Sequence, residues 1–280
     1  MLEILEHSFV ETLEISLLVF VALVAMDLIY IYSRGKLASF LKRRPATQYL
    51  ISSLLGAIPG CEGVYFAISL HTHGLVSFGA LLCAFIATTG DEAFIMFSRF
   101  PMQAFGLTML LLGIGYLIGW SFDFIRKKVN TQHETHCETE IFHPQEEFSL
   151  SHYWQEHLWS HIIKSHMFKI IIWTFIAIFV IELAIQNFDL RNYISENPYW
   201  AILIAALWGL IPQSGPHLIF VTMFAEQSIP FSIFFTNMLV QSGHALLPLL
   251  SISLKDSIII KVISLLLGAL LGSIIFYFGI

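Results

Sequence analysis

The sequence predicts an all-α integral membrane protein with ten helical segments, arranged as two inverted five-segment repeats with broken or re-entrant helices. Hydrophobic residues make up 56% of the 280-residue chain and charged residues only 12%, with a mean hydropathy of +0.75. In an ordinary soluble domain about a quarter of the residues are charged. Long apolar runs recur along the chain, and its two halves share one motif pattern at a constant offset.

Six apolar runs approach the length of about 20 residues that a helix needs to cross a bilayer. They lie near residues 14–33, 75–98, 102–125, 168–187, 217–240 and 257–279. The stretch at the start, "MLEILEHSFVETLE", is acidic and has neither a basic region nor a small-residue cleavage site. We therefore expect no removable signal peptide, and the first run should remain as a helix.

An internal repeat relates the two halves. The motif "LISSLLGAIP" at 50–59 matches "LIAALWGLIP" at 203–212 at an offset of 153, with six identities in ten. The same offset pairs Gly90 with Gly243 and Gly119 with Gly272. We therefore predict a first membrane repeat at 1–126, a cytoplasmic His-rich linker at 127–167 and a second membrane repeat at 168–280.

Each repeat should contain five helical segments in the same order. A long helix comes first, followed by two short pieces broken at "IPGCEG" or "IPQSGP", which are full spans or re-entrant hairpins. A longer piece interrupted at "TTGDE" or "VQSGH" follows, and a long helix ends the repeat. Because five is odd, the second repeat is inverted. Paired interrupted segments of this kind are typical of secondary transporters with a site at the bilayer midplane.

The basic residues predict the orientation in the membrane. Ten of the fourteen lysines and arginines lie in two loops, after the first helix and around the linker. Loops rich in basic residues stay on the cytoplasmic side. Both loops should then be cytoplasmic and the N-terminus outside.

The four predicted breaks carry polar side chains that could bind a metal. The first break and its partner contribute Cys61, Glu62, Gln213, Ser214 and His217; the second break and its partner contribute Thr88, Thr89, Asp91, Glu92, Gln241, Ser242 and His244. Ionisable groups at membrane depth are costly and mark function, and this donor set suits a divalent cation. Asp91 is the preferred ligand because it aligns with His244, whereas an acidic pair could instead cap a helix N-terminus.

Two further acids lie within apolar helices, Asp27 in the first helix and Glu182 in its counterpart. They could couple protons, form a secondary site, or rest at an interface. The linker is rich in potential metal ligands, namely His133, His136, Cys137, His143, His152, His157 and His161. Imidazoles at this density are typical of metal binding, so the linker could collect metal; a solvated linker without that role is the alternative.

Four motifs carry a resemblance to a known family: "QYLISSLLGAIPGCEG", "VSFGALLCAFIATTGDEAFIMF", "GLIPQSGPHLIFVTMFAEQSIPFSI" and "VQSGHALLPLL". Together with the central His/Cys loop, they resemble the bacterial ten-helix heavy-metal exporters, which are named as manganese transporters or arsenic efflux proteins. The resemblance implies export of a divalent metal, with manganese favoured, across the bacterial cytoplasmic membrane. The chain differs at Ser242, where the family often has an acid, and at Asp27, where it often has Glu.

The resulting hypothesis is a secondary transporter and not an enzyme, with a divalent metal ion as substrate and no organic cofactor. The lipid bilayer, the metal ion and protons are the expected partners, and a homo-oligomer is compatible with the sequence. A net charge of -6 gives no basic patch for nucleic acid, and a GxxxxGK[ST] motif is absent. The alternatives are efflux of arsenic compounds or another anion, an intramembrane hydrolase, and a metal sensor.

Overall fold

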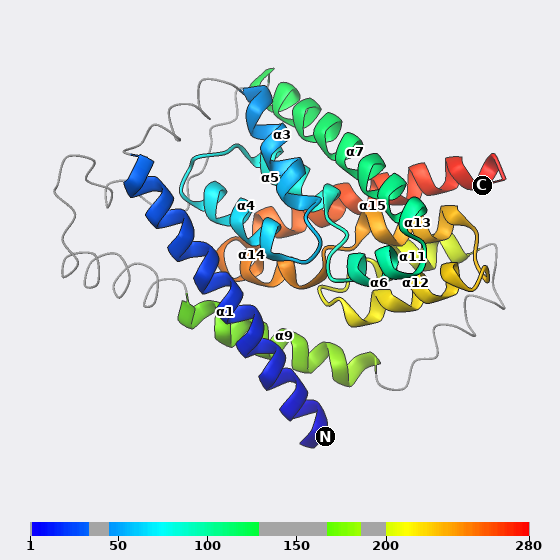
Figure 1. Cartoon of the computed structure of the whole chain (residues 1–280), viewed down its shortest axis with the longest axis horizontal. Coiled ribbons are helices and arrows are strands. Elements are labelled where there is room, and N and C mark those ends of the chain that lie inside the picture. The colour runs from blue at the N-terminus through cyan, green and yellow to red at the C-terminus, as the bar shows by residue number, and fades with distance from the viewer. Residues whose placement is uncertain (1, 34–44, 129–166, 186–199, 280) are drawn as a thin grey trace.

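The computed structural model describes residues 2–33, 45–128, 167–185 and 200–279, and all regular elements in these ranges are helical (Figure 1). The first half contains α1 (Leu2–Ser33), α3 (Pro45–Gly56), α4 (Glu62–Thr72), α5 (Phe78–Ala87), α6 (Glu92–Arg99) and α7 (Pro101–Lys128). The second half contains α9 (Phe168–Ile185), α11 (Ala201–Trp208), η3 (Gly215–His217) with α12 (Leu218–Ala225), α13 (Phe231–Val240), η4 (Gly243–Ala245) with α14 (Leu246–Ile252), and α15 (Leu254–Tyr277).

The helix boundaries repeat at the offset of the sequence motifs. Both ends of α5 and α13 are 153 residues apart, and so are both ends of α4 and the helical stretch Gly215–Ala225. Helices α6 and α14 end at equivalent residues, and α7 and α15 begin at equivalent residues. Two halves with the same order of helices are therefore present; their inverted orientation and the domain limits remain predictions.

Helices of membrane-spanning length are found at the predicted runs 14–33, 102–125 and 257–279, whereas the run 217–240 is divided between α12 and α13 and the run 168–187 coincides with a shorter apolar helix, Ile170–Leu183. Within the described ranges, four helices are long and apolar enough to cross a bilayer: Ile4–Ala25, Pro101–Lys127, Phe231–Ile252 and Leu254–Tyr277. A fifth candidate is the bent pair α5 and α6. The outer faces of the long helices expose apolar side chains such as Leu17, Phe124 and Leu266, which lipid tails can cover without cost. The protein is thus a multi-pass membrane protein.

Both longer interrupted segments break at a glycine with positive φ. Helix α5 starts at its cap, Ser77, whose hydroxyl accepts a hydrogen bond from Ala80 N at 3.1 Å. It ends before Gly90, whose φ is +58°, and the following α6 is bent by 42° from the α5 axis. Gly243, at the equivalent place, has φ +49°. Only glycine adopts this backbone conformation readily, so the two breaks are encoded locally.

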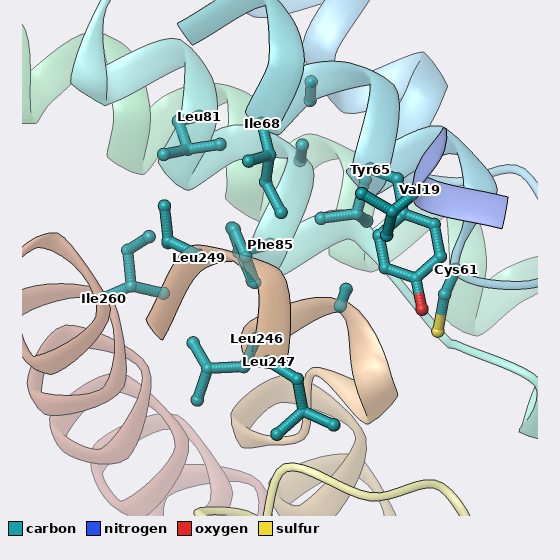
Figure 2. Packing of buried hydrophobic residues seen from close by; sticks show 14 of the residues in the cluster. Val19, Cys61, Tyr65, Ile68, Leu81, Phe85, Leu246, Leu247, Leu249 and Ile260 are labelled. Atoms are coloured by element: carbon teal, nitrogen blue, oxygen red, sulfur yellow. The ribbon is translucent and has the colours of Figure 1, made fainter. Parts of the chain in front are cut away.

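Two large hydrophobic clusters both combine helices of the two halves, and α6 and α14 also pack on their own halves, α6 on α7 and α14 on α9 and α15. One hydrophobic cluster combines α4 and α5 of the first half with α9 and α14 of the second. The other combines α11, α12 and α13 of the second half with α6 and α7 of the first. Figure 2 shows part of the first cluster, where Leu249 of α14 lies beside Phe85 of α5. At the breaks after α5 and α13 the chain therefore passes from one cluster into the other.

Helices α5 and α7 pack with their backbones in close approach. A Cβ added at Gly79 would lie 2.3 Å from the Gly119 carbonyl oxygen, and a Cβ at Gly119 would lie 2.2 Å from that of Gly79. Small residues at such positions are the usual way in which membrane helices achieve close contact. This contact holds α5, and hence its break, in place.

Replacing Gly119 with alanine should destabilise the protein, because the added Cβ would lie against the Gly79 carbonyl oxygen and 2.3 Å from Cys83 Sγ. Overpacking of this kind costs about 1–3 kcal/mol. Gly113→Ala in the same helix is the matched control, because a Cβ there would meet nothing within 4 Å. Thermal unfolding in detergent compares the two variants, and equal unfolding temperatures would contradict the close contact.

Candidate functional site

The four breaks meet at the centre of the molecule. The backbone N–H of Gly60, in the first break, donates to the carbonyl oxygen of Gly90, in the second, at 3.0 Å. Across the halves, Gln241 Nε2 donates to the Thr88 carbonyl oxygen at 3.3 Å. Thr88 and Gln241 occupy equivalent positions of the repeat. The breaks therefore satisfy part of each other's backbone, as membrane depth requires.

Each break places one side chain in a common cluster. Cys61, Asp91 and His244 offer ligand atoms that all lie within 4.8 Å of one another. His244 Nδ1 lies 3.4 Å from Asp91 Oδ2, and Ser214 Oγ donates to the same oxygen at 2.9 Å. Asp91 and His244 are equivalent in the repeat, and so are Cys61 and Ser214. The cluster is thus made of two equivalent pairs.

The members of this central cluster, Cys61, Asp91, Ser214 and His244, differ in their exposure. Cys61 is buried and the His244 side chain is 11% exposed, whereas the Asp91 side chain is 45% exposed. An accessible carboxylate beside a buried imidazole and thiol allows a cation to enter and exchange its water for protein ligands. Carboxylate, imidazole and thiol are the side chains that bind divalent transition metals.

Glu11 of α1 extends the central cluster and was missed by the sequence analysis. Its Oε1 lies 3.1 Å from His244 Nε2, and its Oε2 accepts a hydrogen bond from Gln213 Nε2 at 3.3 Å. The available signal was the helical i,i+4 spacing of His7 and Glu11 in "EHSFVETLE", which puts both side chains on one helix face. That stretch was interpreted only as evidence against a signal peptide.

Glu92 lies beside the central cluster and is fully buried at the start of α6. Among the described residues, neither of its carboxylate oxygens has a hydrogen-bond partner, nor does Gln241 Oε1. Both Glu92 Oε2 and Gln241 Oε1 lie close to Gly90, because a Cβ added there would be 2.4 Å and 3.5 Å from them. Thr89 and Ser242 have buried hydroxyls that are unpartnered as well. Buried unpaired acceptors are costly, and a cation at the centre would relieve that cost.

Two predicted ligands are not brought into the central cluster. Glu62 is exposed at the start of α4, with its carboxylate turned toward Gly60. His217 is fully buried, but its Nε2 forms a hydrogen bond with the Ile211 carbonyl oxygen at 3.0 Å. It therefore closes its own break and supports the backbone there.

The remaining candidates are Glu182, Asp27 and the linker residues, and the structure describes the side-chain contacts of Glu182 alone. Glu182 of α9 contacts His7 Nδ1 at 2.5 Å and accepts from Ser8 Oγ at 3.0 Å, away from the four breaks. Asp27 lies in α1, but its side chain is outside the described residues. All seven linker candidates, His133, His136, Cys137, His143, His152, His157 and His161, also lie outside the described residues.

A buried lysine supports both breaks of the second half, which the sequence analysis did not foresee. Lys261 of α15 donates from Nζ to the carbonyl oxygens of Gly209 at 2.8 Å and Val240 at 3.0 Å. These carbonyls end α11 and α13. A positive charge at helix C-termini is favourable because of the helix dipole. The lone lysine in the apolar run "SIIIKVIS" was the available signal.

The chain matches the model of one protein family, described as "Putative, 10TM heavy-metal exporter", over residues 2–171 and 164–280. These two regions together cover nearly the whole sequence, so the chain belongs to this family. The family resemblance of the four motifs is thereby confirmed. Neither the curated proteins nor the solved structures contain a match to the chain.

Replacing Gly243 with alanine should distort the central cluster and weaken any metal binding there about 10- to 100-fold, as changes to groups that orient ligands do. The new Cβ would lie 2.9 Å from Ser214 Oγ and 3.1 Å from Cys61 Sγ, at a φ of +49° that alanine disfavours. Gly215→Ala is the matched control, with nothing within 4 Å of its Cβ. Isothermal titration of purified variants measures this, and unchanged affinity in Gly243→Ala would contradict the proposed packing of the site.

Proposed function

We propose that this member of the 10TM heavy-metal exporter family is a secondary transporter that binds a divalent metal cation in the central cluster and exports it from the cytoplasm. The observation that carries the proposal is the convergence of one side chain from each of the four breaks on a single point. Asp91 and His244 would bind the metal directly. Ser214 and Gln213 would hold Asp91 and Glu11 in position through their hydrogen bonds.

The charges around the central cluster favour a cation over an anion. Three carboxylates, Asp91, Glu92 and Glu11, lie in or beside it, and His244 is its one imidazole among the described residues. An anionic arsenic compound would meet these carboxylates at membrane depth, where like charges repel strongly. A divalent cation would be attracted by the same groups. Efflux of an anion is therefore the weaker alternative.

The positions of α6 and α14 between the two clusters suggest how access could alternate. Asp91 lies where the chain passes from the cluster of α5 into that of α6, and His244 lies where it passes from the cluster of α13 into that of α14. A movement of one half against the other would change the distance between the two ligands. Rocking of this kind around a fixed site is the general mechanism of transporters built from repeats. The absence of a nucleotide-binding motif in the sequence favours ion coupling over ATP hydrolysis.

Manganese is the metal that we propose within the divalent class. The carboxylates of Asp91 and Glu11 offer hard oxygen donors, and the imidazole of His244 adds a single nitrogen. This set of donors suits Mn²⁺. Cys61 would bring a soft donor, but its thiol lies 3.9 Å from Asp91 Oδ2 in the position of a hydrogen-bond donor. We assign it the role of holding Asp91. Figure 2 shows Cys61 beside the Tyr65 hydroxyl, at the edge of the hydrophobic cluster.

Replacing Asp91 with asparagine should reduce the initial rate of Mn²⁺ uptake into inside-out vesicles by about 100-fold, at the upper end of losses caused by changes around a metal site. The amide would keep the shape of the side chain but remove the charge that offsets dehydration of the cation. Glu14→Gln, an exposed acid on α1, is the control and should transport normally. Equal Mn²⁺ uptake by Asp91→Asn and the unaltered protein would refute the site.

Replacing Cys61 with serine tests the metal preference. Mn²⁺ uptake should stay within about twofold, because a hydroxyl can also donate to Asp91, whereas any Cd²⁺ uptake should fall by about tenfold or more with the loss of a soft donor. Uptake of both metals is measured in the same vesicles. A fall in Mn²⁺ uptake as large as the fall in Cd²⁺ uptake would show that the thiol binds the cargo, and the preference for manganese would be wrong.

A further inference from the structure

We propose that His7, Glu11 and Glu182 form a second divalent-cation site at the contact of α1 and α9, and that metal leaving the central cluster passes through it. We call these three residues the outer site. The inference rests on the proposed export function, but it concerns a different part of the molecule. Nothing in the four breaks predicts it, because two of its residues lie on α1 and one on α9.

The geometry of the outer site suits a metal ion. One ligand atom from each of His7, Glu11 and Glu182 lies within 4.8 Å of the other two. His7 Nδ1 contacts Glu182 Oε1 at 2.5 Å and lies 4.0 Å from Glu11 Oε2. The second oxygen of Glu182 accepts a hydrogen bond from the buried Ser8 hydroxyl at 3.0 Å. An imidazole and two carboxylates around one point are a common set of ligands for divalent transition metals.

Among the described residues, carboxylates outnumber imidazoles around the two sites. Three carboxylates, Glu182, Glu11 and Asp91, face two imidazoles, His7 and His244. The carboxylates of Glu182 and Glu11 are only 15% and 18% exposed. Buried charge without compensation is costly, so the arrangement favours an additional cation.

The central cluster and the outer site share Glu11. Its Oε1 faces His244 of the central cluster, while its Oε2 is the oxygen nearest to His7 of the outer site. His244 is 8% exposed, and its Nε2 is in ion-pair contact with Glu11 Oε1 at 3.1 Å. This contact and the shared carboxylate connect the two sites. A cation can therefore pass from one site to the other without losing contact with Glu11.

The outer site lies toward the end of the molecule that the orientation rule assigns to the outside. The contact of His7 with Glu182 joins the start of α1 to the end of α9, so the two helices are antiparallel (Figure 1). The opposite ends of both helices lead into the two basic loops predicted to be cytoplasmic. The His7 side chain is 65% exposed, and this exposure gives a cation a way out.

The shared carboxylate gives the outer site a function in release. A cation held by His7 and Glu182 draws Glu11 away from His244, and the central cluster then keeps one carboxylate fewer for the next cation. Glu182 would thus act on the cargo itself. Of the two functional roles that the sequence predicts for this acid, proton coupling and a secondary site, the geometry favours the second.

Mn²⁺ binding to the purified full-length chain in lipid nanodiscs tests the inference, with free Mn²⁺ measured from its electron paramagnetic resonance signal. Glu182→Gln and His7→Gln should each bind one Mn²⁺ fewer than the unaltered protein. Glu14→Gln, on the same helix but exposed, should bind the full number. The linker is present in every variant, so any Mn²⁺ that it binds cancels when the numbers of bound ions are compared between variants.

A further variant separates this inference from the proposed function. Asp91→Asn should lose a different Mn²⁺, so that Asp91→Asn combined with Glu182→Gln loses two. If Glu182→Gln and His7→Gln both bind as many Mn²⁺ ions as the unaltered protein, the outer site is refuted, whatever Asp91→Asn does. If Asp91→Asn loses none while Glu182→Gln loses one, the outer site stands and the central assignment fails.

Discussion

The structure depends on how broken helices are kept stable at membrane depth. A helix that stops inside a bilayer leaves backbone groups that lipid cannot satisfy. Here the breaks satisfy one another: Gln241 donates to the Thr88 carbonyl oxygen, and Gly60 donates to that of Gly90. Lys261 donates hydrogen bonds to the carbonyl oxygens of Gly209 and Val240, at the C-termini of two helices that the breaks interrupt. The bonds between the breaks hold the first, second and fourth together, and Ser214 of the third joins them through Asp91, so that a polar site forms there.

The arrangement of the two hydrophobic clusters places this polar centre between them. Had α5 and α6 packed in one cluster and α13 and α14 in the other, Asp91 and His244 would each lie inside one cluster. Instead, each lies where the chain passes from one hydrophobic cluster into the other. The ligands thus lie at the boundary along which the halves would move. A small relative displacement there would change the coordination of a cation more than a larger one elsewhere.

The repeat brings equivalent positions of the two halves close together, but the side chains at these positions differ between the halves. Equivalent residues lie close together because they occupy matching breaks: Asp91 faces His244, and Cys61 and Ser214 both contact Asp91. An acid is thus paired with an imidazole and a thiol with a hydroxyl. Donors of different kinds come together around one point, which two identical halves could not provide. Glu11 adds a further asymmetry, since α1 packs on α4 whereas α9 packs on α14.

The sequence by itself determined the membrane class, the repeat and the residues that lie in the breaks, because these depend on local composition, on glycine and proline, and on a constant offset. Only the tertiary structure decided that Glu62 and His217 lie outside the central cluster and that Glu11, His7 and Lys261 contribute to the two sites and their support. The physical reason is that lipid and protein interior are both apolar. Apolar patterning therefore cannot tell which face of α1 turns inward, and helix packing alone brings Glu11 to His244.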